Sequence, residues 1–191
     1  MTIVANPFLP GFRLVKGEDL SALTNQLASV NKQIVSAGIS PAATGADNVM
    51  AVFSVPANSF SAANNALYIQ AQGKFASNGN TKEVKIIFNA TTAVVGSTVT
   101  GGTAIADSGA VTTNGGGWSL QASVLKYGVA GSNTQLAVHE QAQLGGAVAA
   151  LLAPSLVTAN EGAAILIAVT GNCTTTATDI VLNYVEIDGS N

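Results

Sequence analysis

The chain has 191 residues, of which 9% are charged and 48% are hydrophobic, and its formal net charge is −3. Because about a quarter of the residues in an average soluble protein are charged, this surface must consist of neutral polar residues or be covered by partners. The seven cations form no basic stripe, and no run of 18 apolar residues occurs. We therefore expect neither nucleic acid nor a membrane as a partner.

Residues 1–17 are predicted to form an extended arm, because two prolines in this segment oppose a helix. The arm carries several large apolar side chains, which include Phe8, Phe12 and Leu14. Such an arm is expected to dock on a surface, because exposure of that much apolar area to water is unfavourable. The sequence leaves open whether the surface belongs to its own domain or to a neighbouring subunit.

Residues 18–36 are predicted to form the one helix of the chain. Two acidic residues stand in its first turn, where the helix dipole favours negative charge, and a glycine and a proline follow its end. Its apolar positions are three and four residues apart: Leu20, Leu23, Leu27, Val30 and Ile34. This narrow seam favours contact with another helix over docking on a sheet.

Residues 38–47 are small and form a predicted linker, which separates an N-terminal arm and helix (1–47) from a second domain (48–191). From residue 48 onward the pattern predicts strands throughout. Residues 66–75 and 81–89 alternate between apolar and polar side chains on either side of an Asn-Gly turn. Eight or more strands with frequent turns and no helices between them predict an all-β, antiparallel two-sheet sandwich.

Further strands are predicted over residues 48–55, 92–107, 118–127, 133–144, 151–157, 163–171 and 179–188. In the last of these we expect Ile180, Leu182 and Tyr184 to face the core. Trp118 begins an alternating run and is predicted to be a core residue. Tyr68 and Tyr127 fall on outward faces and are the candidates for an exposed contact.

Few side chains are suited to catalysis. His139 is the only histidine, and it precedes Glu140 on a predicted strand, so the two side chains point to opposite faces. A histidine-dependent triad needs a nucleophile and an acid beside the imidazole. We expect instead a histidine at the surface or at an interface, and a sandwich hydrolase built on these two residues is the least favoured function. Cys173, the only cysteine, is expected to be a small packed hydrophobic residue.

The acidic residues share no motif, and most are expected to be solvated at strand ends or turns. Glu186 and Asp188 share one face of the last predicted strand, where a weak Ca²⁺ site is one interpretation and a solvated acidic tail is the preferred one. With one histidine, one cysteine and no acidic cluster, we expect no catalytic residue, no metal site and no cofactor.

Several segments resemble a known family. Residues 10–20 read Pro-Gly-Phe-Arg-Leu-Val-Lys-Gly-Glu-Asp-Leu. Further segments of the same kind are residues 55–60, 72–76, 78–82 and 117–120. Together they resemble virion structural proteins of tailed bacteriophages, in particular the capsid decoration (cement) proteins. The resemblance implies a jelly-roll domain that binds the outside of a capsid as a trimer or dimer.

We therefore expect a structural protein and not an enzyme. It would be made in the host cytoplasm, form a homotrimer in preference to a homodimer, bind the major capsid protein on the exterior of the virion and stabilise the shell. The alternative is a tail-fibre or baseplate domain that binds a host surface glycan through Tyr68 or Tyr127. The expected interface is the arm and the helix seam, formed by Phe8, Phe12, Leu14, Leu20, Leu23, Leu27, Val30 and Ile34.

Overall fold

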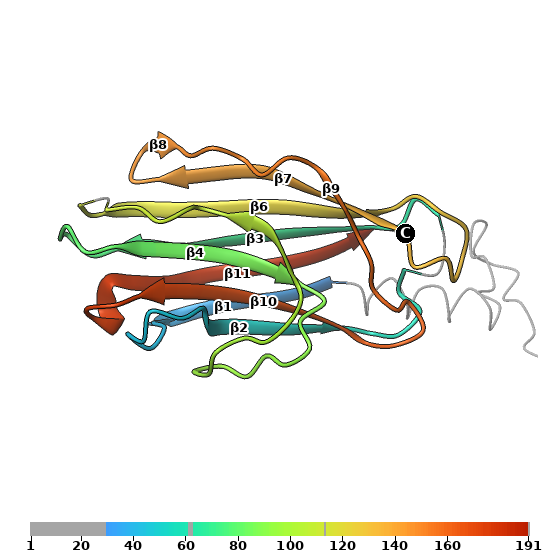
Figure 1. The fold of residues 1–191 in the computed structure, drawn as a ribbon, viewed down its shortest axis with the longest axis horizontal. Helices are drawn as coiled ribbons and strands as arrows, with labels where there is room; N and C mark the ends of the chain where they lie inside the picture. Colours follow the sequence, from blue (N-terminus) through green and yellow to red (C-terminus); the bar gives the residue numbers. More distant parts are fainter. Residues whose placement is uncertain (1–29, 61–62, 113, 191) are drawn as a thin grey trace, which may run out of the picture.

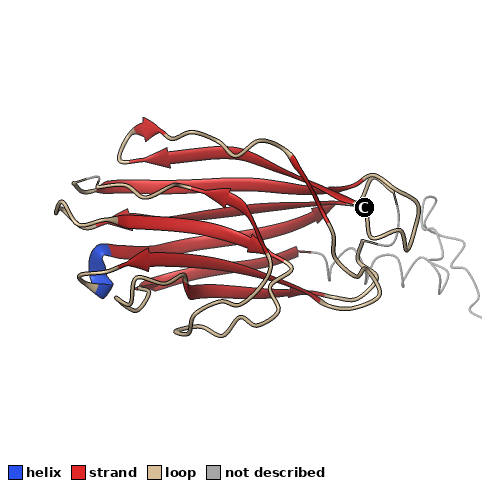
Figure 2. Cartoon of the chain, in the orientation of Figure 1, coloured by secondary structure: helices blue, strands red, loops and turns tan. Residues whose placement is uncertain are grey.

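The computed structural model describes residues 30–60, 63–112 and 114–190. These residues form eleven strands in two antiparallel sheets that pack face to face, with one short 3-10 helix (Figures 1 and 2). The elements are β1 (Val30–Ile39), β2 (Asn48–Val55), β3 (Ala66–Phe75), β4 (Lys82–Phe88), β5 (Thr103–Asp107), β6 (Gly116–Lys126), β7 (Gln135–Leu144), β8 (Ala147–Val148), β9 (Ser155–Val157), β10 (Ile165–Cys173), η1 (Ala177–Asp179) and β11 (Ile180–Ser190). The predicted all-β sandwich is confirmed.

The strand pairing has the nested order of a jelly roll. β4 pairs with β5, β3 with β6, β2 with β10 and β1 with β11, and successive pairs alternate between the two sheets. One sheet has the order β2-β10-β4-β5, and the other has the order β1-β11-β3-β6-β7-β8, with β9 also on β7. Two Greek keys folded together give this arrangement, and β7–β9 are inserted between β6 and β10 and widen one sheet.

The predicted helix is wrong over residues 30–36, because β1 is a strand whose register runs from Val30 opposite Asp188 to Ile34 opposite Tyr184. A spacing of four residues fits both a helix and a strand, and β1 also contains several β-branched residues, which favour strands. β1 lies in the sandwich although it precedes the boundary predicted after residue 47. The arm and Leu20, Leu23 and Leu27 lie outside the described residues.

The core fills the space between the sheets with aliphatic and aromatic side chains. Trp118 is buried there and stacks on Phe75 with 6.2 Å between ring centroids, which confirms its predicted core position. The Trp118 ring covers Gly73, where an added Cβ would lie only 2.6 Å from the indole. Cys173 is buried and free, as expected of a packed thiol.

A β-bulge in β11 changes which side chains face the core. Leu182 pairs with Gly73 and Tyr184 pairs with Gln72, the adjacent residue of β3, so Asn183 is the extra residue. Before the bulge Ile180 and Leu182 are buried, and after it Val185 and Ile187 are buried. The prediction that Tyr184 faces the core is therefore wrong, since one extra residue turns the following side chains to the other face.

Two ionic clusters are buried inside the sandwich. Lys126 and Glu161, whose side chains are 0% and 2% exposed, form an ion pair with 2.5 Å between Nζ and Oε1. Gln135 Nε2 and the Gly131 amide donate to the same carboxylate, and Lys126 also donates to the Ser132 hydroxyl. Every charge in this cluster has close partners, which a buried ion pair needs in order to be tolerated.

The second cluster joins the β3–β4 connection, which crosses from one sheet to the other, to η1. Asp179 accepts hydrogen bonds from the side-chain amides of Asn78 and Asn80, and Lys82 Nζ donates to Asn78 and to the Asn80 carbonyl. Both Lys82 and Asp179 are fully buried. The expectation that acidic residues are solvated is therefore wrong for Asp179 and Glu161, and the outer surface holds fewer charges than the composition indicates.

Lys126→Met should destabilise the fold by about 3–5 kcal/mol, because it leaves Glu161 buried without its cation. Urea unfolding followed by circular dichroism measures the change. Lys85→Met is the matched control: Lys85 pairs with Asp47 and Glu83 at a partly exposed site, where the loss should be roughly 1 kcal/mol or less. Equal losses in the two variants would show that burial of the Lys126 pair is unimportant.

Candidate functional site

Residues 147–156 run along the edge of the seven-stranded sheet beside β7, and we call this segment the apolar rim. It begins with β8, whose Ala147 and Val148 pair with Leu144 and Gln143, and it ends in β9. Between these strands the chain leaves the regular ladder and is tied to β7 by the hydrogen bond from the Ala149 amide to the Ala142 carbonyl. The edge of β7 is thus covered by the chain itself.

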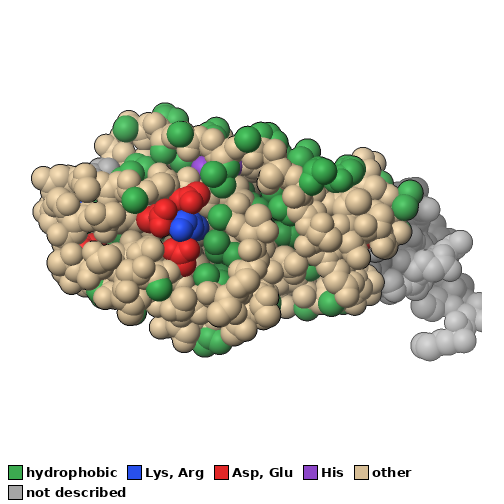
Figure 3. Space-filling model, in the orientation of Figure 1, with side chains coloured by type: hydrophobic (Ala, Val, Ile, Leu, Met, Phe, Trp, Pro, Cys, Tyr) green, Lys and Arg blue, Asp and Glu red, His purple; other side chains and the backbone are tan. Residues whose placement is uncertain are grey.

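The rim exposes large hydrophobic side chains. Val148 is 79% and Leu156 is 72% exposed, and Leu151 and Leu152 are exposed as well. No charged residue occurs between Glu140 and Glu161. Figure 3 shows apolar side chains following this edge of the molecule. A row of exposed apolar side chains of this kind is typical of an interaction surface.

The rim covers the sheet edge in a way that disfavours addition of another strand. Pro154 lacks an amide hydrogen, and residues 149–154 lie outside the ladder. A partner on this edge would therefore be held mainly by side-chain packing and not by backbone hydrogen bonds. The interface predicted from the sequence, the arm and helix seam, does not include the rim, although the apolar run after Gly145-Gly146 was a signal for it.

His139 lies beneath the rim. We expected a histidine at the surface or at an interface, and the surface alternative is wrong, because His139 is 4% exposed and points inward from β7. Its Nδ1 accepts a hydrogen bond from the Leu152 amide at 2.9 Å. Burial lowers the pKa of His139, and this effect outweighs the backbone of Gln141 and the charge of Asp107, which raise it. The neutral imidazole thus fixes the backbone of the rim at Leu152.

A second bulge, in β7, places Glu140 on the outer face of the same sheet. Gln121 pairs with Gln141 and Ala122 pairs with His139, so Glu140 is the extra residue. Its side chain is exposed while that of His139 is buried, which confirms that the two point to opposite faces. Bulges often re-aim a side chain beside a functional site.

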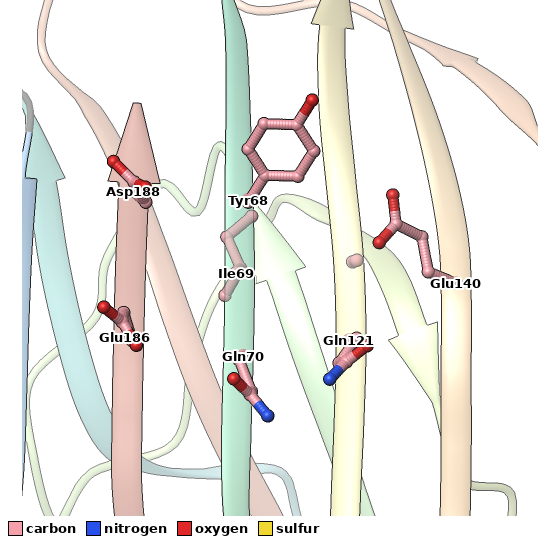
Figure 4. Close-up of a pocket in the computed structure, with 8 residues that line it drawn as sticks. Tyr68, Ile69, Gln70, Gln121, Glu140, Glu186 and Asp188 are labelled. Atoms are coloured by element: carbon pink, nitrogen blue, oxygen red, sulfur yellow. The ribbon is translucent and has the colours of Figure 1, made fainter. Parts of the chain in front are cut away.

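A shallow groove of about 330 Å³ crosses the outer face of the seven-stranded sheet (Figure 4). It crosses β11, β3, β6 and β7. Its lining residues are Tyr68, Ile69, Gln70, Gln121, Ala122, Glu140, Glu186 and Asp188. The carboxylates of Glu186 and Asp188 lie on one side and that of Glu140 on the other, with the amides and the tyrosine between them.

The groove contains one of the two tyrosines that sequence analysis selected. Tyr68 and Tyr127 are both about half exposed, and any contact they make stays a prediction. Only Tyr68 lines the groove, while Tyr127 follows the end of β6. Glu186 and Asp188 share one face as predicted, and Glu186 also hydrogen-bonds the Tyr184 hydroxyl.

Within the described part of the chain, no three His, Cys, Asp or Glu side chains gather closely enough to hold a metal ion. Likewise, none of its helices has the length and apolar character needed to cross a membrane. No protein-family model matches the chain, and no curated protein matches it in sequence. The rim and the groove are therefore the two features of the described structure on which a function can be proposed.

Stability should fall as the pH is lowered from 7.5 to 5.5. The pKa of His139 is lowered in the folded state, so the unfolded chain takes up a proton first, around the ordinary value of 6.5, and stability is lost as the pH falls further towards the folded pKa. His139→Gln keeps an acceptor near the Leu152 amide but cannot titrate. Urea midpoints should depend on pH in the wild type and much less in the variant, and identical slopes would contradict a role for His139.

Proposed function

We propose that the protein is a structural component of a virus particle that self-associates through the apolar rim and decorates the outside of a capsid. The observation that carries this proposal is the exposed rim itself, a charge-free row of large hydrophobic side chains along one sheet edge. A surface of this kind is stable in water when a partner covers it. The proposed role is binding, with no catalytic step.

The rim is rich enough to contribute strongly to association. Burial of a fully exposed Val or Leu side chain is favourable by about 1.5–3 kcal/mol, and Val148 and Leu156 are largely exposed while Leu151 and Leu152 are partly so. Burial of these four side chains would contribute several kcal/mol of favourable free energy. Association also loses translational and rotational freedom and orders interface side chains, and both effects reduce the net free energy. Surrounding neutral residues would have to complete an interface of about 800 Å² per partner.

The distribution of charge supports the same role. Four charged residues lie in the interior: Lys82, Lys126, Glu161 and Asp179. A partner that binds the outer surface therefore does not have to remove water from these side chains. Lys85 is neutralised locally by Asp47 and Glu83. A surface with few exposed charges can enter a contact at low desolvation cost.

The geometry of the sheet bears on the symmetry of the proposed oligomer. The rim and β1 lie at opposite edges of the seven-stranded sheet. Contact of one rim with another gives a twofold dimer, whereas contact of a rim with a different surface gives a ring when the rotation between copies closes and a filament when it does not. We favour the ring, in the form of a homotrimer.

The proposed partner in the capsid is the major capsid protein, which this protein would bind on the exterior of the shell. The jelly roll is a fold that virus capsids use, and the sequence resembles decoration proteins. In a symmetric shell each copy contributes a modest contact, and an oligomer that engages several shell subunits at once gains by avidity. Stabilisation of the shell would then follow from many small contacts and not from one strong one.

Wild-type protein should sediment as a trimer in analytical ultracentrifugation, and the double variant Val148→Asp/Leu156→Asp should sediment as a monomer, because each aspartate would be buried uncompensated at the interface. Val94→Asp is the matched control: Val94 is 57% exposed but lies in the β4–β5 loop, away from the rim. A monomeric wild type at high concentration would refute self-association. Failure of the protein to co-sediment with capsids would refute decoration alone.

A further inference from the structure

The groove on the outer face of the seven-stranded sheet is separate from the rim at its edge. The two outer strands that it crosses each contain a bulge, β7 at Glu140 and β11 at Asn183. Bulges bend a strand and increase its twist, so two of them on either side of β3 and β6 curve this face. The groove therefore occupies a part of the sheet whose two outer strands are both irregular.

The lining offers three kinds of chemistry side by side. The ring of Tyr68 presents an apolar face with a polar tip. Gln70 and Gln121 come from neighbouring strands in direct register, and their amides both donate and accept hydrogen bonds. Carboxylates on the two sides accept hydrogen bonds only. A ligand that satisfies this set needs apolar C–H faces together with several hydroxyl groups.

We propose that this groove binds an uncharged saccharide. The Tyr68 ring would stack on the apolar face of one sugar ring, and the amides and carboxylates would hydrogen-bond its hydroxyls. β7 and β11 are three strand spacings apart, or about 14 Å, which leaves room for a short oligosaccharide across β3 and β6. The volume of about 330 Å³ is near the lower end of ligand sites, as suits one or two sugar units.

The charge of the groove narrows the class of sugar. Glu140 and Asp188 stand on opposite sides and form no ion pair with another described residue. Two such carboxylates disfavour sialic and uronic acids, because like charges repel at short range. Neutral hexoses and N-acetylhexosamines remain. This proposal stands apart from self-association, since the rim is not part of the groove.

Isothermal titration with cellobiose, lactose, N,N′-diacetylchitobiose and 3′-sialyllactose tests the proposal on the full-length protein. At least one neutral disaccharide should bind with Kd below about 10 mM, and sialyllactose should bind more weakly than lactose. Failure of all three neutral sugars to bind, or stronger binding of sialyllactose than of lactose, would overturn it.

Variants then locate the site. Tyr68→Ala should raise the Kd of the bound sugar about tenfold, while Tyr68→Phe should retain most of the affinity because the ring remains. Tyr127→Ala is the matched control, since Tyr127 is equally exposed but outside the groove. Circular dichroism melting checks that each variant is folded. If Tyr127→Ala weakened binding as much as Tyr68→Ala did, the assignment to the groove would be wrong.

Discussion

The buried pair of Lys126 and Glu161 holds together the part of the molecule on which both functional proposals depend. Lys126 ends β6, and Glu161 precedes β10, so the ion pair closes the insertion that contains β7, β8 and β9. Gln135, at the start of β7, binds the same carboxylate and also the Ala159 backbone. The rim and Glu140 of the groove both belong to this insertion. This ionic cluster therefore adds to the core packing of Ala137, Ala142, Leu144 and Val157 in fixing the insertion.

The sequence predicts the regular parts of this fold well. Alternation predicts the strands β3 and β4, and the inward phase of Trp118 is correct. The hairpin predicted from the Asn-Gly turn between β3 and β4 is wrong, because the two strands lie in different sheets and do not pair. The errors occur where long-range contacts decide the outcome. Val30 and Ile34 fit a helix seam and a strand equally, and pairing with β11 settles the matter. Local periodicity cannot reveal such a choice.

The candidate sites were harder to predict because bulges and single hydrogen bonds create them. One extra residue in β11 turns Tyr184 outward, and no pattern in the sequence marks Asn183 as that residue. His139 is buried on the inward face of β7, and its acceptor nitrogen binds an amide 13 positions later, a contact that local periodicity does not predict. The two tyrosines could be identified as exposed, but their separation, one inside the groove and one outside, depends on the curvature of the assembled sheet.

The covering of the β7 edge by residues 147–156 has a consequence for how growth of an assembly stops. Sheets with bare edges can recruit strand after strand and elongate into fibrils. Here the apolar rim, which includes Pro154, occupies that edge. Copies can therefore associate through apolar side chains without the backbone hydrogen bonds that add one strand after another. Association through this edge should then favour discrete particles of fixed stoichiometry over an open-ended polymer.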